Sequence, residues 1–208
     1  MIKRSATSVF LAVLFLFTLN ACGSLSRISQ ENLPFSENEA ALAAQTKWRA
    51  DGKLSINHRG KRQTVSFQWQ QHGDDYSIHM FGPFGQGSTW LRRTDNRVTL
   101  ESAKYGKQQA KSAEALLTKH LGWQLPIGQL VYWIRGIPAP QSRSNQALRH
   151  QNGALSQILQ KDWRVDFVRH QTVRGWHLPE KIRLDYQDIQ AIAVIKRWDL
   201  PEAPSHTL

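Results

Sequence analysis

The chain has 208 residues and a formal net charge of +11, from 27 lysines and arginines against 16 aspartates and glutamates. It contains one cysteine, which excludes an intrachain disulfide, so stability must come from packing. The basic balance favours anionic partners, although it also serves simply to keep a domain soluble.

The N-terminus has the pattern of a lipoprotein signal peptide, which we assign to residues 1–21. Lys3 and Arg4 precede an apolar run, Val9 to Leu19, that is too short to span a bilayer comfortably. The following LNAC motif resembles a bacterial lipobox, because a small residue stands directly before Cys22. The resemblance implies cleavage before Cys22 and acylation of that cysteine. The alternative is a buried or free thiol, or an ordinary secretory signal in which Cys22 is incidental.

Lipidation has consequences for location and partners. Two or three acyl chains anchor durably, since each buried methylene contributes about 0.8 kcal/mol. Lipoproteins retained in the inner membrane usually carry aspartate after the cysteine, so Gly23 favours the periplasmic face of the outer membrane. Loss of Lys3 and Arg4 leaves 25 basic against 16 acidic residues, a mature charge of +9. In the envelope the anionic partners are phospholipid head groups or an acidic carrier, and nucleic acid is not expected.

Residues 22–37 predict a lipidated tether, because they are polar, lack periodicity and contain Pro34. Ser36 and Glu39 fit a capping box that opens a short alanine-rich helix ending near Lys47. The mature length suits one domain with a sizeable core, which we place at residues 38–208.

Alternation of apolar and polar residues then predicts an antiparallel meander, with turns at Arg59 to Lys61 and Gly73 to Asp75. In the clearest case, Val65, Phe67 and Trp69 alternate with polar neighbours. The predicted strands are Lys53–Asn57, Thr64–Gln70, Tyr76–Met80, Ser88–Arg93 and Arg97–Glu101.

The period changes in the middle of the chain. Helical spacing predicts one helix over Ala113–Leu121, between Ser112 as N-cap and Gly122 as stop, and a second over Ile127–Ile134. Strands resume afterwards, and the last is apolar on both faces, which indicates a central or covered strand. These strands are Trp163–Phe167, Ile182–Tyr186 and Ala191–Trp198. The sum is an α+β domain in which helices cover the concave face of a large antiparallel sheet.

No catalytic or metal-binding constellation is evident. The histidines include no i, i+4 pair, so the sequence predicts neither a metal nor a cofactor. Ser88 lacks the strand-to-helix context of a hydrolase nucleophile, and His79 fits a surface or satisfied histidine better than a base. We therefore expect no enzyme, and rank an envelope hydrolase last among the alternatives.

Tryptophan is abundant, with eight residues. Trp123 and Trp133 fall in the segment that would cover the sheet, where short helices can enclose an apolar pocket. The alternative is that these side chains are ordinary core. The candidates for cavity or lid are Trp69, Trp123, Leu130, Trp133 and Ile134.

Several features occur together in order: the lipobox at Cys22, the FQWQ strand, the GPFG loop, the segment LGWQLPIGQLVYWIRGIPAP over 121–140, and a terminal strand ending in Trp198. Together they resemble the LolA/LolB-like lipoprotein-localisation family, and within it the LolB-type outer-membrane receptors. The resemblance implies an incomplete, strongly curved antiparallel β-barrel, closed by a lid of short α-helices that encloses an apolar cavity. It also implies a receptor that takes lipoproteins from the periplasmic carrier LolA and inserts them into the outer membrane.

The resemblance extends to one loop. In the family, asparagine or glycine, proline, an exposed apolar residue and glycine follow the third strand, and Gly82, Pro83, Phe84 and Gly85 match this pattern. Phe84 stands where leucine is common. The match implies a membrane-insertion loop that contacts outer-membrane phospholipid. From composition alone, Phe84 is equally a plug folded back on the core.

We expect a monomer that binds the acyl chains of cargo lipoproteins and passes them downhill from carrier to bilayer without nucleotide hydrolysis, because exposing each methylene to water costs about 0.8 kcal/mol. The alternative is a structural or assembly lipoprotein that binds outer-membrane proteins or peptidoglycan.

Overall fold

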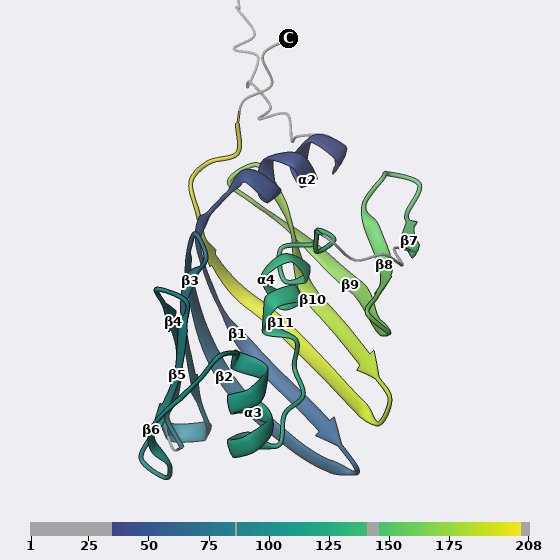
Figure 1. Ribbon diagram of the computed structural model, residues 1–208. Helices are drawn as coiled ribbons and strands as arrows, with labels where there is room; N and C mark the ends of the chain where they lie inside the picture. The colour runs from purple at the N-terminus through teal and green to yellow at the C-terminus, as the bar shows by residue number, and fades with distance from the viewer. Residues whose placement is uncertain (1–34, 86, 141–145, 205–208) are drawn as a thin grey trace, which may run out of the picture. The chain divides into compact units, whose positions relative to one another are not determined.

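The computed structural model describes residues 35–85, 87–140 and 146–204 (Figure 1). The predicted signal peptide, Cys22 and most of the predicted tether lie outside these residues. Within them, no helix is long and apolar enough to cross a membrane.

The fold is built on one open antiparallel sheet of 11 strands, in the order β6-β5-β4-β3-β2-β1-β11-β10-β9-β8-β7 (Figure 1). All the neighbours pair antiparallel, and nearly all are consecutive in sequence, as hairpin connections require. The exception is the pair of β1 with β11, the first and last strands of the described sheet, which meet at its centre. The strands are β1 Lys47–His58, β2 Lys61–His72, β3 Asp75–Phe81, β4 Thr89–Thr94, β5 Arg97–Ser102, β6 Gly106–Ala110, β7 Gln146–Arg149, β8 Leu155–Gln160, β9 Trp163–Val173, β10 Trp176–Tyr186 and β11 Ile189–Asp199.

A β-bulge at Gly52 lets the central strands approach each other closely. The pairing of β1 with β11 shifts register between Asp51 and Gly52. A Cβ atom at Gly52 would lie 2.2 Å from the carbonyl oxygen of Val194 and 2.8 Å from the ring of Phe67, so only glycine fits. Bulges bend a strand and increase its twist, which favours the curvature that a half-barrel requires.

Within the described ranges, three α-helices and one 3-10 turn complete the fold: α2 Phe35–Ala44, η1 Pro83–Gly85, α3 Ala113–Leu121 and α4 Ile127–Trp133. Figure 1 shows α3 and α4 against one face of the sheet and α2 across one end of it. The core lies between this face and the helices. The expected architecture, an incomplete antiparallel barrel with a helical lid, is confirmed.

The alternating segments and both lid helices form where the sequence predicts them. The two-sided apolar strand is β11, at the centre of the sheet, and its outer-face residues Ile192 and Val194 are half-buried. The capping box is wrong: α2 begins at Phe35 and already includes Ser36. The Glu39 carboxylate, instead of reaching back to the start of the helix, pairs with Arg149.

Candidate functional site

An apolar cavity lies between the concave face of the sheet and the lid helices. Its volume is about 50 Å³, and by the same measure one water molecule needs about 10–15 Å³. Every lining side chain is apolar. They are Leu54, Phe67, Trp69, Ile78, Met80, Leu91, Leu117, Trp123, Leu125, Ile127, Leu130, Ile134, Ile182, Leu184 and Ala193.

The first lid helix, α3, has well-defined ends. The Ser112 hydroxyl oxygen accepts a hydrogen bond from the Ala115 amide at 3.2 Å, which satisfies one free donor of the first turn. Gly122 ends the helix at a φ of 71°, and the amide of Trp123 donates back to the Leu117 carbonyl at 3.2 Å. These caps orient the buried Leu116 and Leu117 toward the sheet.

The second lid helix, α4, is joined to the sheet by buried polar bonds. The indole N–H of Trp133 donates to Oε1 of Gln160 on β8 at 2.6 Å, and neither side chain is exposed. The same Gln160 amide accepts from the Ala139 amide at 2.9 Å and donates to the Ala139 carbonyl at 3.1 Å. Since all these groups are buried, breaking the network leaves several of them unsatisfied.

Arg135, just beyond α4, is a buried cation. Its guanidinium donates to the carbonyl oxygens of Leu42, Gln45 and Val131 at 2.5, 2.9 and 2.9 Å. Burial lowers the pKa of Arg135 to about 10, and the nearby Tyr132 acts in the opposite direction. The guanidinium also lies 5.7 Å from the ring centroid of Trp48. The end of α4 is therefore tied to the end of α2.

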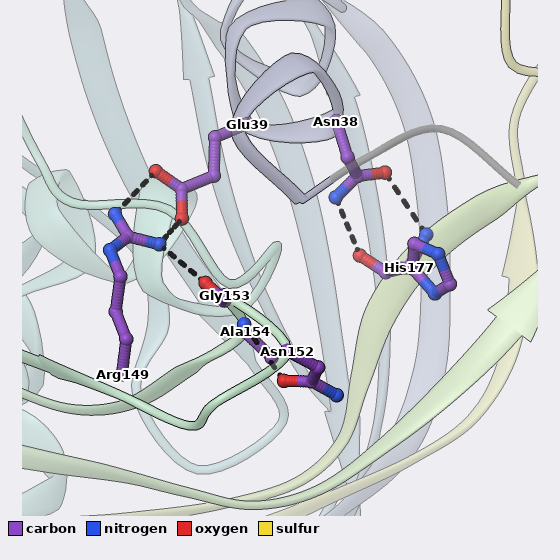
Figure 2. Close-up of polar contacts among 7 residues, drawn as sticks. All are labelled: Asn38, Glu39, Arg149, Asn152, Gly153, Ala154 and His177. Atoms are coloured by element: carbon purple, nitrogen blue, oxygen red, sulfur yellow. Dashed lines mark hydrogen bonds and ion pairs between the residues drawn. The ribbon is translucent and has the colours of Figure 1, made fainter.

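Helix α2 is held on its other side by two polar clamps (Figure 2). The Asn38 side chain donates to the His177 carbonyl at 2.9 Å and accepts from the His177 amide at 3.0 Å, so it pairs with β10 as another strand would. The Arg149 guanidinium pairs with the Glu39 carboxylate and donates to the Gly153 carbonyl at 2.9 Å. No sequence pattern indicated these clamps, because their partners lie more than 100 residues away, 139 for Asn38 and 110 for Glu39.

Phe84 lies in the loop between β3 and β4 and is fully exposed, at 100%. This exposure excludes the core plug. Its backbone has φ 58° and ψ 23°, the left-handed region that costs a residue with a β-carbon roughly 1–2 kcal/mol. Seven other described non-glycine residues, all in hairpin turns, share the left-handed φ, so it is the exposed apolar ring that distinguishes Phe84.

The structure brings together most of the predicted cavity and lid residues. Trp69, Trp123, Leu130 and Ile134 line the cavity. Trp133 lies on α4 but packs on Trp163, with ring centroids 6.3 Å apart, and does not line the cavity. Cys22 lies outside the described residues.

Most of the cavity wall was not singled out by sequence reasoning. It consists mostly of the inward-facing members of alternating strands, such as Leu54, Phe67 and Met80. The alternation predicts that these residues face inward, but it does not distinguish a residue that touches a cavity from one that fills the core.

The described residues lack the parts of a hydrolytic site. The Ser88 hydroxyl and Nε2 of His79 lie 2.7 Å apart, and burial, then the Arg92 cation, lowers the pKa of His79. Across the described ranges, however, no carboxylate bonds to His79 to orient it as a base. The same residues contain no group of histidine, cysteine or acidic side chains suited to a metal ion.

The chain matches the family model described as "LolB: Outer membrane lipoprotein LolB" over residues 46–198. It is 34% identical over 197 residues to the "Outer-membrane lipoprotein LolB" of Pseudomonas aeruginosa PAO1, covering 91% of this chain and 95% of that protein. It is 36% identical over 164 residues to the protein of that name from Stutzerimonas stutzeri, covering 79% of each.

Among solved structures, a LolA superfamily protein from Nitrosomonas europaea superposes with a TM-score of 0.54 at 9% identity, covering 83% of this chain and 96% of that one. At this identity the likeness bears on the fold alone.

Proposed function

The chain belongs to the family of outer membrane lipoprotein LolB, and from this premise we propose that it receives lipoproteins from the periplasmic carrier LolA and inserts them into the outer membrane. Its role is therefore lipoprotein localisation at the outer membrane rather than enzymatic catalysis. The handover, the acyl-binding cavity and the independence from nucleotides are our proposal. So are acylation of Cys22, the boundaries of the signal, tether and domain, and the monomeric state.

The observation that carries the proposal is the cavity, because its lining is wholly apolar. An acyl chain cannot cross the aqueous periplasm free, since each exposed methylene costs about 0.8 kcal/mol. A wall of leucine, isoleucine, methionine and aromatic side chains offers such a chain dispersion contacts without a competing polar partner. The flexible Met80 side chain adapts to different chain positions.

The cavity must expand to take cargo. A space of about 50 Å³ admits only a few water molecules and is too small for an acyl chain. Loading then requires part of the lid to move. Helix α4 is fixed by the buried Trp133 and Arg135 hydrogen bonds. In contrast, α3 and the segment after it are held mainly by apolar contacts. Two hydrogen bonds add to these, from Trp123 Nε1 to Gln63 at 3.2 Å and from the Gly128 amide of α4 to the Glu114 carboxylate of α3 at 3.3 Å, and both bonds are exposed or only partly buried. We therefore assign the opening movement to α3.

Transfer runs downhill through differences in affinity. The receptor binds acyl chains better than the carrier does, and the bilayer binds them better still. No nucleotide site is required for such a sequence of steps. The mature charge of +9, given by 25 basic against 16 acidic residues, raises the rate of encounter with an acidic carrier more than the final affinity.

The test is a transfer assay in which the mature chain with Cys22→Ala is mixed with LolA carrying a lipoprotein, without nucleotide. We expect the cargo to leave the carrier and co-purify with this chain. Retention of the cargo on LolA at excess receptor would contradict the proposal and would favour the structural or assembly alternative.

A further inference from the structure

A second cleft, separate from the apolar cavity, lies on the side of the sheet next to the Phe84 loop. It has a volume of about 800 Å³ and lies between Gly85 and residues 87–90 on one side, where the loop leads into β4, and residues 101–107 on the other, where β5 turns into β6. Gly85, which directly follows Phe84, belongs to its wall. The cleft therefore adjoins the loop that we propose to enter the membrane.

The charges of this cleft are predominantly positive. Lys104 and Lys107 are exposed in its wall, and neither forms an ion pair with any described residue. Its one carboxylate, Glu101, is already paired with Arg92 at 3.0 Å. Two lysine charges are thus left without a counter-charge, and the site is suited to an anion.

The aromatic side chains of the cleft are arranged as at a membrane interface. The Trp90 ring stacks on the His79 ring, with the two centroids 4.1 Å apart and an angle of 6° between the ring planes. The Arg92 guanidinium lies 4.3 Å from the centroid of the Trp90 ring. Tyr105 lies beneath the Lys104 ammonium at 5.0 Å. Half-buried tryptophan and tyrosine next to cations are typical of the headgroup level of a bilayer.

We propose that this cleft binds the anionic phosphate of an outer-membrane phospholipid headgroup while Phe84 enters the acyl region beside it. The occupant is a phospholipid within the bilayer, because the site adjoins an exposed apolar residue that a soluble anion does not require. The contact fixes the orientation of the receptor on the membrane, which a single phenylalanine cannot do alone. The inference rests on the proposed delivery function and adds a lipid-specific step to it.

The test uses the full lipidated chain reconstituted in vesicles, either of phosphatidylcholine alone or with phosphatidylglycerol added. Because Cys22 is the only natural cysteine, a spin label on Gln109→Cys reports from exposed β6, next to the cleft. The label's accessibility to oxygen dissolved in the bilayer measures how closely the cleft approaches the lipid. The double variant Lys104→Glu/Lys107→Glu tests the site. The matched control, Lys161→Glu, alters an exposed lysine in the turn between β8 and β9.

We expect phosphatidylglycerol to raise the accessibility of the label in the unmodified protein and in Lys161→Glu. In the double variant, the fraction of protein in the membrane-apposed orientation should fall by at least about tenfold, since each lysine near an anionic surface contributes about a fivefold factor. Equal accessibility in both kinds of vesicle, or an equal loss in Lys161→Glu, would overturn the proposal.

Cargo acceptance from LolA, measured on the same samples, separates this inference from the function on which it rests. Acceptance that is normal in the double variant, with delivery slowed only into phosphatidylglycerol vesicles, supports the headgroup site. Normal acceptance together with delivery that depends neither on the headgroup nor on the two lysines rejects the site. It leaves the proposed function standing. Failure of the unmodified protein to accept cargo rejects the proposed function itself.

Discussion

The guanidinium of Arg135 donates a hydrogen bond to the backbone carbonyl of Gln45 over 2.9 Å, and so joins the end of the lid helix α4 to the segment between α2 and β1. Arg135 is only 4% exposed, and no carboxylate among the described residues pairs with it. Its charge is satisfied by carbonyl groups instead. This contact holds the α4 half of the lid in place, and the opening movement that we propose belongs to the α3 half.

Replacing this arginine tests the anchor. A lysine at position 135 keeps the charge but cannot reproduce the planar fork that reaches several carbonyls at once. We expect Arg135→Lys to lower the free energy of unfolding by about 1–3 kcal/mol, since at least one buried carbonyl is left unpaired. Urea unfolding measures the change, and the exposed Arg97→Lys provides the control. An unchanged midpoint in Arg135→Lys would show that the anchor contributes nothing.

The opening side of the lid gives a second prediction. Trp123→Phe removes the hydrogen bond to Gln63 but keeps most of the apolar contact. The substitution should lower the free energy of opening α3 by about 1 kcal/mol. Amide hydrogen exchange in α3 should therefore become about five times faster. Exchange in α4, held by Trp133 and Arg135, should remain unchanged. Equal acceleration in both helices would mean that the lid opens as one unit.

The Phe84 loop gives a third prediction. Phe84→Glu should leave the fold and cargo acceptance intact but slow delivery into vesicles, because a charge replaces an apolar side chain whose burial contributes roughly 1.5–3 kcal/mol. Phe84→Leu should restore delivery.

Phe84→Asn separates backbone from side chain at this position. Asparagine tolerates the left-handed conformation, so thermal stability should be kept or raised while delivery is lost. Loss of folding or of cargo acceptance in Phe84→Glu would contradict the role of an exposed membrane contact.

A fourth prediction concerns pH. Burial, followed by the neighbouring His150 and His177, lowers the pKa of His170 below its usual value of about 6.5. At pH values below about 6.5 the unfolded chain therefore binds more protons at this residue than the folded chain. The free energy of unfolding should fall as the pH decreases through this value. The Phe35 ring stacks on His177 with centroids 4.4 Å apart, so the start of α2 lies in this cluster.

The free energy of unfolding, measured at several pH values, should show this loss at low pH. The loss should be smaller in His170→Gln, because glutamine does not titrate. It should be unchanged in His72→Gln, since His72 is an exposed residue on β2. A pH dependence identical in His170→Gln and the unmodified protein would assign the effect to other groups.

The sequence predicts the regular parts of this fold well because their patterns are local. Alternation in Val65, Phe67 and Trp69 reports directly on a strand with one buried face, and Ser112 and Gly122 mark the ends of α3 by their own backbone chemistry. Strand β6, with the sequence GKQQA, is an edge strand with no buried residue, so no alternation reveals it. Strand β7 is exposed along its whole length for the same reason.

The residues of the candidate site are likewise of two kinds: those that local spacing predicts and those that only tertiary contacts place. Lid residues such as Leu130 and Ile134 follow from helical spacing and do line the cavity. Trp133, one turn away from Leu130, turns to Gln160 on β8 instead, and only the tertiary pairing decides this. The clamp of Asn38 on His177 likewise joins residues 139 positions apart. Contacts of this kind depend on the assembled sheet and leave no local pattern.

The central claim is that acyl chains bind in the apolar cavity beneath the lid. Its most direct test is the binding of a fluorescent fatty-acyl probe to the mature chain with Cys22→Ala, compared with the same protein carrying Leu54→Glu. Leu54 is half-buried and lines the cavity, whereas the neighbouring Lys53 is exposed on the other face of β1, so Lys53→Glu is the control. We predict saturable binding that survives Lys53→Glu and is lost in a folded Leu54→Glu protein, because a carboxylate at the wall resists desolvation. Binding that does not saturate, or that is equal in both variants, would contradict the account.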